Sequence, residues 1–317
     1  MFRTNRGRSN KRRHSLVSAL MTLFIVIAAL YGFSYYNSNG EIFHLPDIPA
    51  FSFSGNHGEI AENVPEDYNL HVTFLDVGQG NCTLIESDGH YMLIDGGDGS
   101  HSSFVVSYLS QYGIASLDYV IISHYDADHL SGVIGVLYNY PVGTLLSPDY
   151  ETDTKIYNSY INCTTTQGIE PVHPVIGNTF ALGNSSFTVV SPDNYQYDDE
   201  NNRSIGIRIN DDNHSFLVLG DAEKESETDM IADNVYVKSD VYMVSHHGSS
   251  SSSSAKFLKA VNPDYAVISV GADNKYGHPT DITLARLASD NITIFRTDQE
   301  GTIHAYSTPD GIVWQFE

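Results

Sequence analysis

The sequence predicts an α/β protein in which two β-rich halves form sheets that face each other, with helices on the outside. The first observation is that short apolar runs, bounded by turn residues, alternate with stretches of helical periodicity. The second is that the half starting near residue 186 continues this alternation without any repeat of fixed length. The third is composition, because 41% hydrophobic residues with 14 Phe and 21 Tyr can fill a large core in a chain of 317 residues.

The predicted elements begin near Leu70 and follow one another closely. In the first half we expect strands at 70–76, 82–87, 91–95 and 117–123, and helices at 104–113 and 130–139. In the second half we expect strands at 186–191, 204–210, 215–221, 241–248, 264–271, 292–297, 301–307 and 311–316, and helices at 222–231, 254–261 and 281–288.

The N-terminal segment has the pattern of a membrane anchor. Residues 16–33 carry no charge and directly follow a segment with six Lys and Arg and no acid. This length and flanking charge predict a basic cytoplasmic tail at 1–15 and a single transmembrane helix at 16–36. A linker rich in Asn, Gly, Pro and Ser follows at 37–67, so the domain at 68–317 would be extracellular. A cleaved signal peptide, which would give a secreted protein, is the alternative.

The rest of the chain is strongly acidic. Beyond the basic tail, 10 Lys and Arg face 39 Asp and Glu, which leaves a net charge of −29. Such a field repels nucleic-acid backbones, so tight non-specific binding to long DNA is not expected. The two cysteines, Cys82 and Cys163, are compatible with either a disulfide or buried free thiols.

The stretch SHYDADHLSG, residues 123–132, gathers potential metal ligands directly after an apolar run. His124 and Asp126 are two positions apart, so an extended backbone would project them to the same side. Asp128 and His129 are adjacent and therefore diverge, which suits a second metal ion. A solvated polar turn is the alternative.

Further candidates stand at the ends of later apolar runs. Asp221 ends FLVLGD, His246 and His247 follow VYMVS, and His278 lies in KYGHPT. Strands that end in such residues aim them at the rim of a sheet, where several could converge on one cleft. We interpret seven other histidines as surface residues: His44, His57, His71, His101, His173, His214 and His304.

The motifs HVTFLDVGQGNCTLIE, YMLIDGG, IISHYDADHLSG, LVLGDAEKE, VYMVSHHGSSSSS and AVISVGADNKYGHPT, in this order, resemble the metallo-β-lactamase fold. The resemblance is to the C-terminal extracellular domain of the competence protein ComEC and its free-standing relatives, and it runs from about residue 70 to the C-terminus. It implies a four-layered αββα sandwich with a cleft for two metal ions at one rim.

The resemblance also implies a role for each candidate ligand. His124 and Asp126 would bind one metal, Asp128 and His129 the other, and Asp221 would bridge them. His278 would close the shell of the second metal. We expect His246 to complete the first shell and His247 to lie near the substrate, although the reverse order stays open. The donor set favours two divalent ions, Zn or Mn.

This site predicts phosphoester hydrolysis, with DNA or a nucleotide as the substrate class implied by the family. Two metal ions can activate water and stabilise both oxygens of an in-line displacement at phosphorus. Asp128 would orient the nucleophile, and His247 would protonate the leaving oxygen. The candidate substrate-binding residues are Ser249, Arg203 and Tyr276. A phosphocholine-type esterase of cell-wall phosphodiesters and a non-catalytic surface binding module are the alternatives, and the Asp126 pattern argues against β-lactam hydrolysis.

Overall fold

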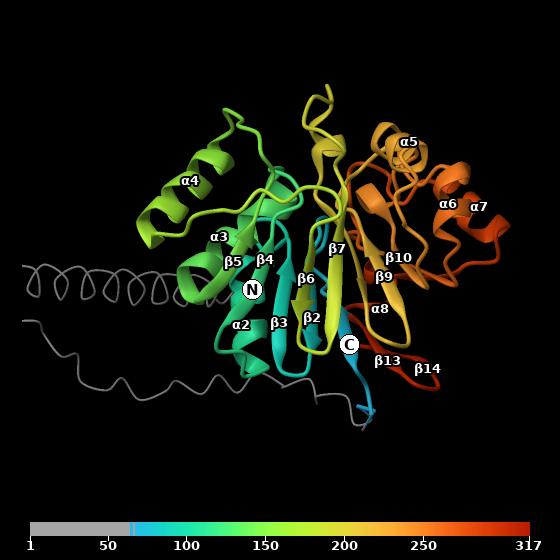
Figure 1. Cartoon of the computed structure of the whole chain (residues 1–317), viewed down its shortest axis with the longest axis horizontal. Coiled ribbons are helices and arrows are strands. Elements are labelled where there is room, and N and C mark those ends of the chain that lie inside the picture. The colour runs from blue at the N-terminus through green and yellow to red at the C-terminus, as the bar shows by residue number, and fades with distance from the viewer. Residues whose placement is uncertain (1–63, 66) are drawn as a thin grey trace, which may run out of the picture. The chain divides into compact units, whose positions relative to one another are not determined.

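The structure of the chain is a computed structural model that describes residues 64–65 and 67–317. It confirms the predicted sandwich, because two seven-stranded sheets face each other with helices on both outer sides (Figure 1). The first sheet, sheet A, has the order β14-β13-β1-β2-β3-β4-β5. Its strands are β1 (Leu70–Phe74), β2 (Thr83–Ser87), β3 (His90–Ile94), β4 (Leu117–Ile121), β5 (Val142–Leu146), β13 (Ile303–Thr308) and β14 (Gly311–Phe316).

The second sheet, sheet B, is built from the second half of the chain, in the order β12-β11-β10-β9-β8-β7-β6. Its strands are β6 (Thr179–Leu182), β7 (Ser185–Ser191), β8 (Gly206–Asn210), β9 (Ser215–Val218), β10 (Val241–Met243), β11 (Tyr265–Ile268) and β12 (Thr293–Arg296). The helices are α2 (Ser102–Gln111), α3 (Ala127–Asn139), α4 (Lys155–Gln167), α5 (Lys224–Ala232), α6 (Ala255–Val261), α7 (Asp281–Ser289) and the short α8 (Thr297–Glu300).

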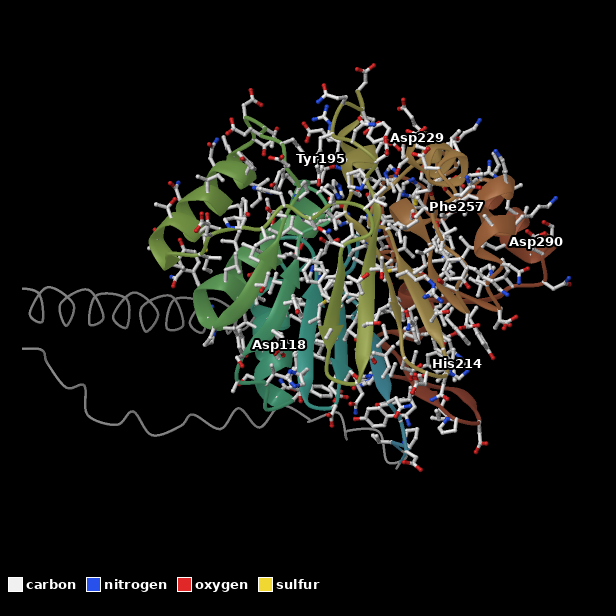
Figure 2. All side chains as sticks on the ribbon, viewed as in Figure 1. Asp118, Tyr195, His214, Asp229, Phe257 and Asp290 are labelled. Carbon is white, nitrogen blue, oxygen red and sulfur yellow. The ribbon has the colours of Figure 1, made fainter. Side chains whose placement is uncertain are left out.

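Three hydrophobic layers hold the sandwich together, as period-2 alternation in the strands requires. In β1, Leu70, Val72 and Phe74 all enter the layer between the two sheets. A second layer joins sheet A to α2, α3 and α4, and a third joins sheet B to α5, α6 and α7. The side chain of Phe257, labelled in Figure 2, comes from α6 and is fully buried in this third layer.

The predicted N-terminal features lie outside the described residues. These are the basic tail at 1–15, the anchor at 16–36 and, except for a few positions, the linker at 37–67. Among the helices of the described part, none has both the length and the apolar character needed to cross a bilayer. Cys82 and Cys163 are both buried free thiols, so the disulfide alternative is not realised in this structure.

Helix α4 and strands β5 and β6 were not expected from the sequence. The interior of α4, KIYNSYINCTTTQ, is largely polar, and it buries only Tyr160, Cys163 and Thr164. The residues at its two ends could have predicted this helix. The Thr154 side chain accepts a hydrogen bond from the backbone N–H of the third helical residue, and Gly168 ends the helix with φ 66°. Caps therefore marked this helix better than its hydrophobic pattern did.

Helix α3 docks against the end of β3 through two glycines. Gly132 lies on the face of α3 that meets the backbone of Gly96, and a Cβ on Gly132 would collide with the Gly96 carbonyl. The backbone N–H of Gly96 donates to the carbonyl of His129 over 2.8 Å. This close contact sets the position of the first turn of α3 relative to sheet A.

Replacing Gly132 by alanine is expected to destabilise the domain by roughly 1 to 3 kcal/mol, because the new methyl group has no space. In a helix position with free space, replacing glycine by alanine would instead stabilise the protein by about 1 kcal/mol. A decrease in the free energy of unfolding would therefore indicate the close contact with Gly96. Urea unfolding followed by circular dichroism measures the effect. Gly99→Ala is the matched control, because its Cβ would lie 3.8 Å from the Ser131 Cβ. Equal unfolding midpoints for the two variants would contradict the packing argument.

Candidate metal centre

The loop between β4 and α3 supplies the first donors of the site. β4 ends at Ile121, and the chain then reaches Asp126, the extended N-cap residue of α3 with φ −69° and ψ 149°. The His124 imidazole is fully buried, and its Nε2 lies 3.7 Å from a carboxylate oxygen of the exposed Asp126 side chain. Asp128 and His129 occupy the first turn of α3. An extended segment followed by a helical turn therefore provides two pairs of donors with different directions.

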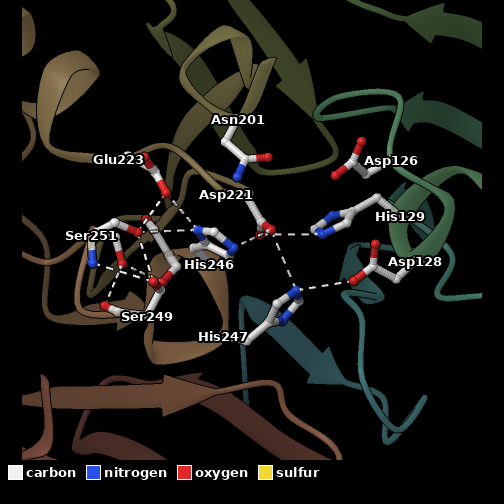
Figure 3. Close-up of polar contacts among 12 residues, drawn as sticks. Asp126, Asp128, His129, Asn201, Asp221, Glu223, His246, His247, Ser249 and Ser251 are labelled. Carbon is white, nitrogen blue, oxygen red and sulfur yellow. Dashed lines mark hydrogen bonds and ion pairs between the residues drawn. The ribbon is translucent and has the colours of Figure 1, made fainter. Parts of the chain in front are cut away.

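Asp221, which follows β9, is the residue around which the donors gather (Figure 3). Its Oδ1 lies 3.2 Å from His129 Nε2, and its Oδ2 lies 3.5 Å from His247 Nε2. His247 Nε2 also lies 3.5 Å from Asp128 Oδ2. In the described part of the chain, two groups of three residues bring donor atoms within 4.8 Å of one another: His124 with His129 and Asp221, and Asp128 with His129 and His247.

The buried donor atoms lack hydrogen-bond partners, as expected for atoms that bind a cation. Such atoms include Nε2 of His124, His129 and His247, and Oδ1 of Asp221, whose approach to His129 does not have hydrogen-bond geometry. Each buried polar atom left without a partner costs about 1 to 3 kcal/mol. Imidazole nitrogens and carboxylate oxygens are ligands for Zn²⁺ and Mn²⁺. The residues present therefore fit a pair of divalent metal ions.

Asp95, which follows β3, fixes the orientation of the two histidines in the stretch SHYDADHLSG, residues 123–132. Its Oδ2 lies 2.8 Å from His129 Nδ1, and the same carboxylate accepts hydrogen bonds from the N–H and the hydroxyl of Ser123. The Ser123 hydroxyl lies 3.0 Å from His124 Nδ1. Because Nδ1 of each ring is engaged, Nε2 of each ring faces the donor groups.

The electrostatics of the cluster favour ionised carboxylates. Burial alone would raise the pKa of Asp221, but His129 and His247 hold it well below its usual value. Burial likewise opposes the charged form of His129, yet Asp221 and Asp95 raise the pKa of His129 well above its usual value. Burial also opposes ionisation of Asp128, but His247 and His129 lower its pKa to about 2. At neutral pH these carboxylates carry the negative charge that cations require.

The consecutive residues His246 and His247 point to different partners. Both have left-handed backbone conformations, with φ 51° and φ 53°, which are uncommon outside glycine. His247 donates from Nδ1 to the Ser269 carbonyl over 2.9 Å and belongs to the donor group with Asp128. His246 directs Nδ1 to Glu223 Oε1 at 2.9 Å and belongs to neither donor group. From the sequence we expected His246 to be the ligand, and the geometry favours the reverse order.

His278 lies beside the cluster rather than inside it. Its ring centroid is 5.4 Å from that of His246 and 6.5 Å from that of His247, and it belongs to neither donor group. Its buried Nδ1 has no hydrogen-bond partner. Asn274 holds the loop by accepting from the His278 N–H and donating to its carbonyl. His278, which we expected to close the shell of the second metal, therefore lies next to His246. The ring of Tyr276 stacks on the ring of His278, with centroids 5.8 Å apart.

Two of the three substrate-binding candidates are engaged inside the protein. The Ser249 hydroxyl is buried and lies 2.7 Å from that of Ser251. Arg203 donates from Nε to the Tyr197 carbonyl over 2.9 Å, and its guanidinium lies 5.0 Å from the ring centroid of Tyr150. The third candidate, the tyrosine stacked on His278, is 57% exposed. It is therefore the one most accessible to a substrate.

The surface beside Asp126 is acidic. A cavity of about 500 Å³ is lined there by Asp126, Asp198, Asp199, Glu200 and Asn201. Tyr125 forms part of the wall of another cavity, of about 580 Å³, next to α4. No Lys or Arg is among the lining residues of either cavity in the described part of the chain.

Comparison with known proteins decides the family. The family model described as "Metallo-beta-lactamase superfamily" matches residues 75–272. The chain belongs to the metallo-β-lactamase superfamily. Together with the two donor groups, this membership supports a metal-dependent hydrolase as the general class of the protein.

Curated relatives carry names from competence and recombination. ComE operon protein 3 of Bacillus subtilis is 29% identical over 252 residues, covering 73% of this chain and 32% of the relative. Competence protein ComA of Neisseria gonorrhoeae is 30% identical over 246 residues, covering 76% and 33%. Recombination protein 2 of Haemophilus influenzae is 34% identical over 221 residues, covering 68% and 26%. This metallo-β-lactamase chain thus spans about a third of the length of these relatives or less.

Among solved structures, the metallo-β-lactamase fold protein YhfI of Bacillus subtilis is similar to this chain. The TM-score is 0.51 at 13% sequence identity, and the match covers 74% of this chain and 99% of YhfI. At this identity the likeness concerns the fold alone.

Sequence reasoning missed one polar partner in this metallo-β-lactamase site. Glu223 was not singled out, although it holds the Nδ1 of His246. The available signal was the spacing in GDAE, because Glu223 follows Asp221 by two positions and its backbone is extended, with φ −107° and ψ −175°.

Asp95→Asn is expected to weaken Zn²⁺ binding by roughly 10- to 100-fold, because the carboxylate that orients His129 loses its charge. Asparagine tolerates the left-handed backbone at this position, where φ is 58°. Competition with a chromophoric chelator measures the affinity. Asp118→Asn, in β4, is the control, since Asp118 accepts hydrogen bonds from His90 and from the Tyr91 N–H at the start of β3, away from Asp95. Unchanged affinity in Asp95→Asn would argue against the orienting role.

Proposed function

We propose that this chain is a dinuclear metallohydrolase that cleaves a phosphoester. The observation that carries the proposal is the convergence of buried, unpartnered imidazole nitrogens on the carboxylates of Asp221 and Asp128. The proposed donors are His124 and Asp126 for one ion, Asp128, His129 and His247 for the other, and Asp221 for both. Zn²⁺ and Mn²⁺ both suit this set of three imidazoles and three carboxylates.

The ions would supply an activated water and charge stabilisation at the phosphoryl oxygens. Within the chain, Asp128 would accept a hydrogen bond from the attacking water. Its carboxylate is partly exposed, and its Oδ2 lies 3.5 Å from His247 Nε2. We therefore keep Asp128 in the catalytic role that the sequence suggests.

His246 is the proposed proton donor to the leaving oxygen, in place of His247. Glu223 binds its Nδ1, so Nε2 is left facing the cleft, 3.8 Å from Asp221 Oδ2. The Ser251 hydroxyl also donates to Glu223 and fixes this carboxylate. An imidazole held by a carboxylate at one nitrogen can release a proton from the other at a defined position. Glu223 acts here as a positioning residue.

Two classes of substrate are proposed, a phosphodiester of DNA or a nucleotide and a small phosphodiester with a positive group. The names of the competence and recombination relatives support a phosphodiester of DNA or a nucleotide. The acidic lining beside Asp126 favours instead a small phosphodiester that carries a positive group, such as a phosphocholine ester. A non-catalytic binding module on the same fold is the alternative to both. The charge-free run at 16–33 supports a membrane-anchored protein with its catalytic domain outside.

A hydrolysis screen with added Zn²⁺ or Mn²⁺ tests the proposed function directly. The substrates are bis-p-nitrophenyl phosphate, single-stranded DNA, a dinucleotide, a phosphocholine ester and nitrocefin. Metal-dependent turnover of a phosphodiester without turnover of nitrocefin is the expected pattern. If metal-loaded protein cleaves none of them, the binding module is favoured.

Asp128→Ala is expected to lower the turnover of the best phosphodiester by at least roughly 100-fold, because the variant loses a donor and the orienting carboxylate together. Metal content and circular dichroism are measured on the same sample to separate loss of metal from loss of fold. Asp153→Ala, an exposed position outside the site, should retain full activity. Activity of Asp128→Ala near that of this control would refute the assignment.

Glu223→Gln and His246→Asn are expected to show a loss that depends on the leaving group. With an alkyl leaving group, which needs a proton, kcat should fall about 100-fold with little change in KM. With p-nitrophenolate, which leaves without a proton, the loss should be only a few-fold. The exposed Glu225→Gln is the control for charge on the same segment. An equal loss for both substrates would show that the pair serves structure rather than proton transfer.

A further inference from the structure

A third cavity, lined by aromatic rings and acidic residues, lies on the outer face of sheet A. Strand register places Tyr306, His71, Glu86 and Tyr91 in one row across β13, β1, β2 and β3. These positions alternate with the apolar residues that face sheet B, so the row is on the face opposite the central core. The cavity has a volume of about 180 Å³.

Aromatic rings form most of its wall. The rings of His71 and Tyr306 are stacked, with centroids 4.1 Å apart and an interplanar angle of 11°. Tyr68 closes one side, with its ring 5.2 Å from that of Tyr306 at 69°. Tyr91 and Tyr112 complete the lining on the side of α2. His71 and Tyr306 cover each other's facing surfaces, whereas rings that meet edge-on, such as Tyr68 and Tyr306, point faces and edges in different directions around one small volume.

The charge in this cavity is negative. Glu86 accepts a hydrogen bond from Gly89 N–H through Oε1, whereas its Oε2 is buried without a partner of hydrogen-bond geometry. Glu317 also lines the cavity and accepts a hydrogen bond from the Tyr112 hydroxyl at 3.1 Å. No Lys or Arg is among its lining residues in the described part of the chain. Burial and His304 lower the pKa of His71 to about 3, so His71 adds no positive charge at neutral pH.

We propose that this cavity is a binding site for a small organic cation that carries an alkylated ammonium group. Tyrosine faces attract such cations, and the half-buried carboxylate of Glu86, together with that of Glu317, supplies the opposite charge. The two glutamates disfavour anions, although Glu317 Oε1 lies 3.2 Å from Nε2 of His304, which also lines the cavity. A metal ion is not the expected ligand, because the donor groups of the described residues both lie at the metal centre.

The site is separate from the proposed catalysis. Glu86 and Tyr91 lie near the turn that joins β2 to β3, whereas Asp95 follows the opposite end of β3 and contacts the metal centre. The inference therefore stands or fails independently of the phosphoester proposal.

Choline and its uncharged isostere 3,3-dimethylbutan-1-ol provide the test. Both are titrated at millimolar concentrations into the purified protein at low ionic strength, with binding followed by calorimetry and protein NMR. We expect choline to bind and the alcohol to bind at least roughly 5-fold more weakly, because only choline gains the cation–π and charge interactions. Absence of choline binding, or equal binding of both compounds, would overturn the proposal.

Four variants locate the binding. Glu86→Gln and Tyr68→Leu are each expected to weaken choline binding by roughly 5- to 30-fold, whereas Tyr68→Phe keeps the ring and the affinity. Tyr236→Leu is the control. Tyr236 is exposed and lies in the loop between α5 and β10, so this variant should bind choline as the parent protein does. Glu86→Gln preserves the side-chain volume, so its folded state should remain comparable. Unchanged affinity in both Glu86→Gln and Tyr68→Leu would place the cation elsewhere and reject this site.

Discussion

The burial of Asp221 among imidazoles is the constraint on which the rest of the site depends. A buried carboxylate is costly unless opposite charge and hydrogen bonds surround it. Here His129 and His247 approach its two oxygens from different sides, and each ring is held at its far nitrogen by Asp95 or by the Ser269 carbonyl. Orientation is thus set from outside the cluster, and the atoms inside it remain available to cations.

This constraint explains why the site needs both sheets. β3 and β4 run parallel in sheet A, and β9, β10 and β11 run parallel in sheet B, so each set brings its carboxyl ends to one edge. The donors come from the loops that follow those ends. Packing the sheets face to face then brings the two edges together at one rim, with α3 fixed by its glycine contact with the end of β3.

The sequence predicted which residues form the site better than it predicted which way their side chains point. Period-2 apolar runs located most strands, and polar residues at their ends located the donors. The order of His246 and His247 was not readable, because it depends on two consecutive left-handed residues that aim adjacent side chains apart. His304 was expected at the surface yet is buried beside His71, because β13 pairs with β1 although residues 71 and 304 are 233 positions apart in the sequence. Single-residue tendencies contain no information about such pairing, and α4 was missed for the related reason that few of its residues are buried.

The proposed metal ions and the acidic residues beside the cleft would act in opposite ways on different phosphates of a substrate. The chain has a net charge of −23, but at physiological ionic strength the Debye length is about 8 Å, so distant carboxylates act weakly. A phosphate in the cleft would interact mainly with the proposed metal ions, whereas a neighbouring phosphate would lie near Asp198, Asp199 and Glu200. Repulsion would therefore increase with each phosphate that extends past Asp126, and a short phosphodiester or one with a cationic substituent would avoid it. For the proposed phosphoester substrate, local charge around the cleft, rather than the total charge of the chain, would thus set the length that can be accepted.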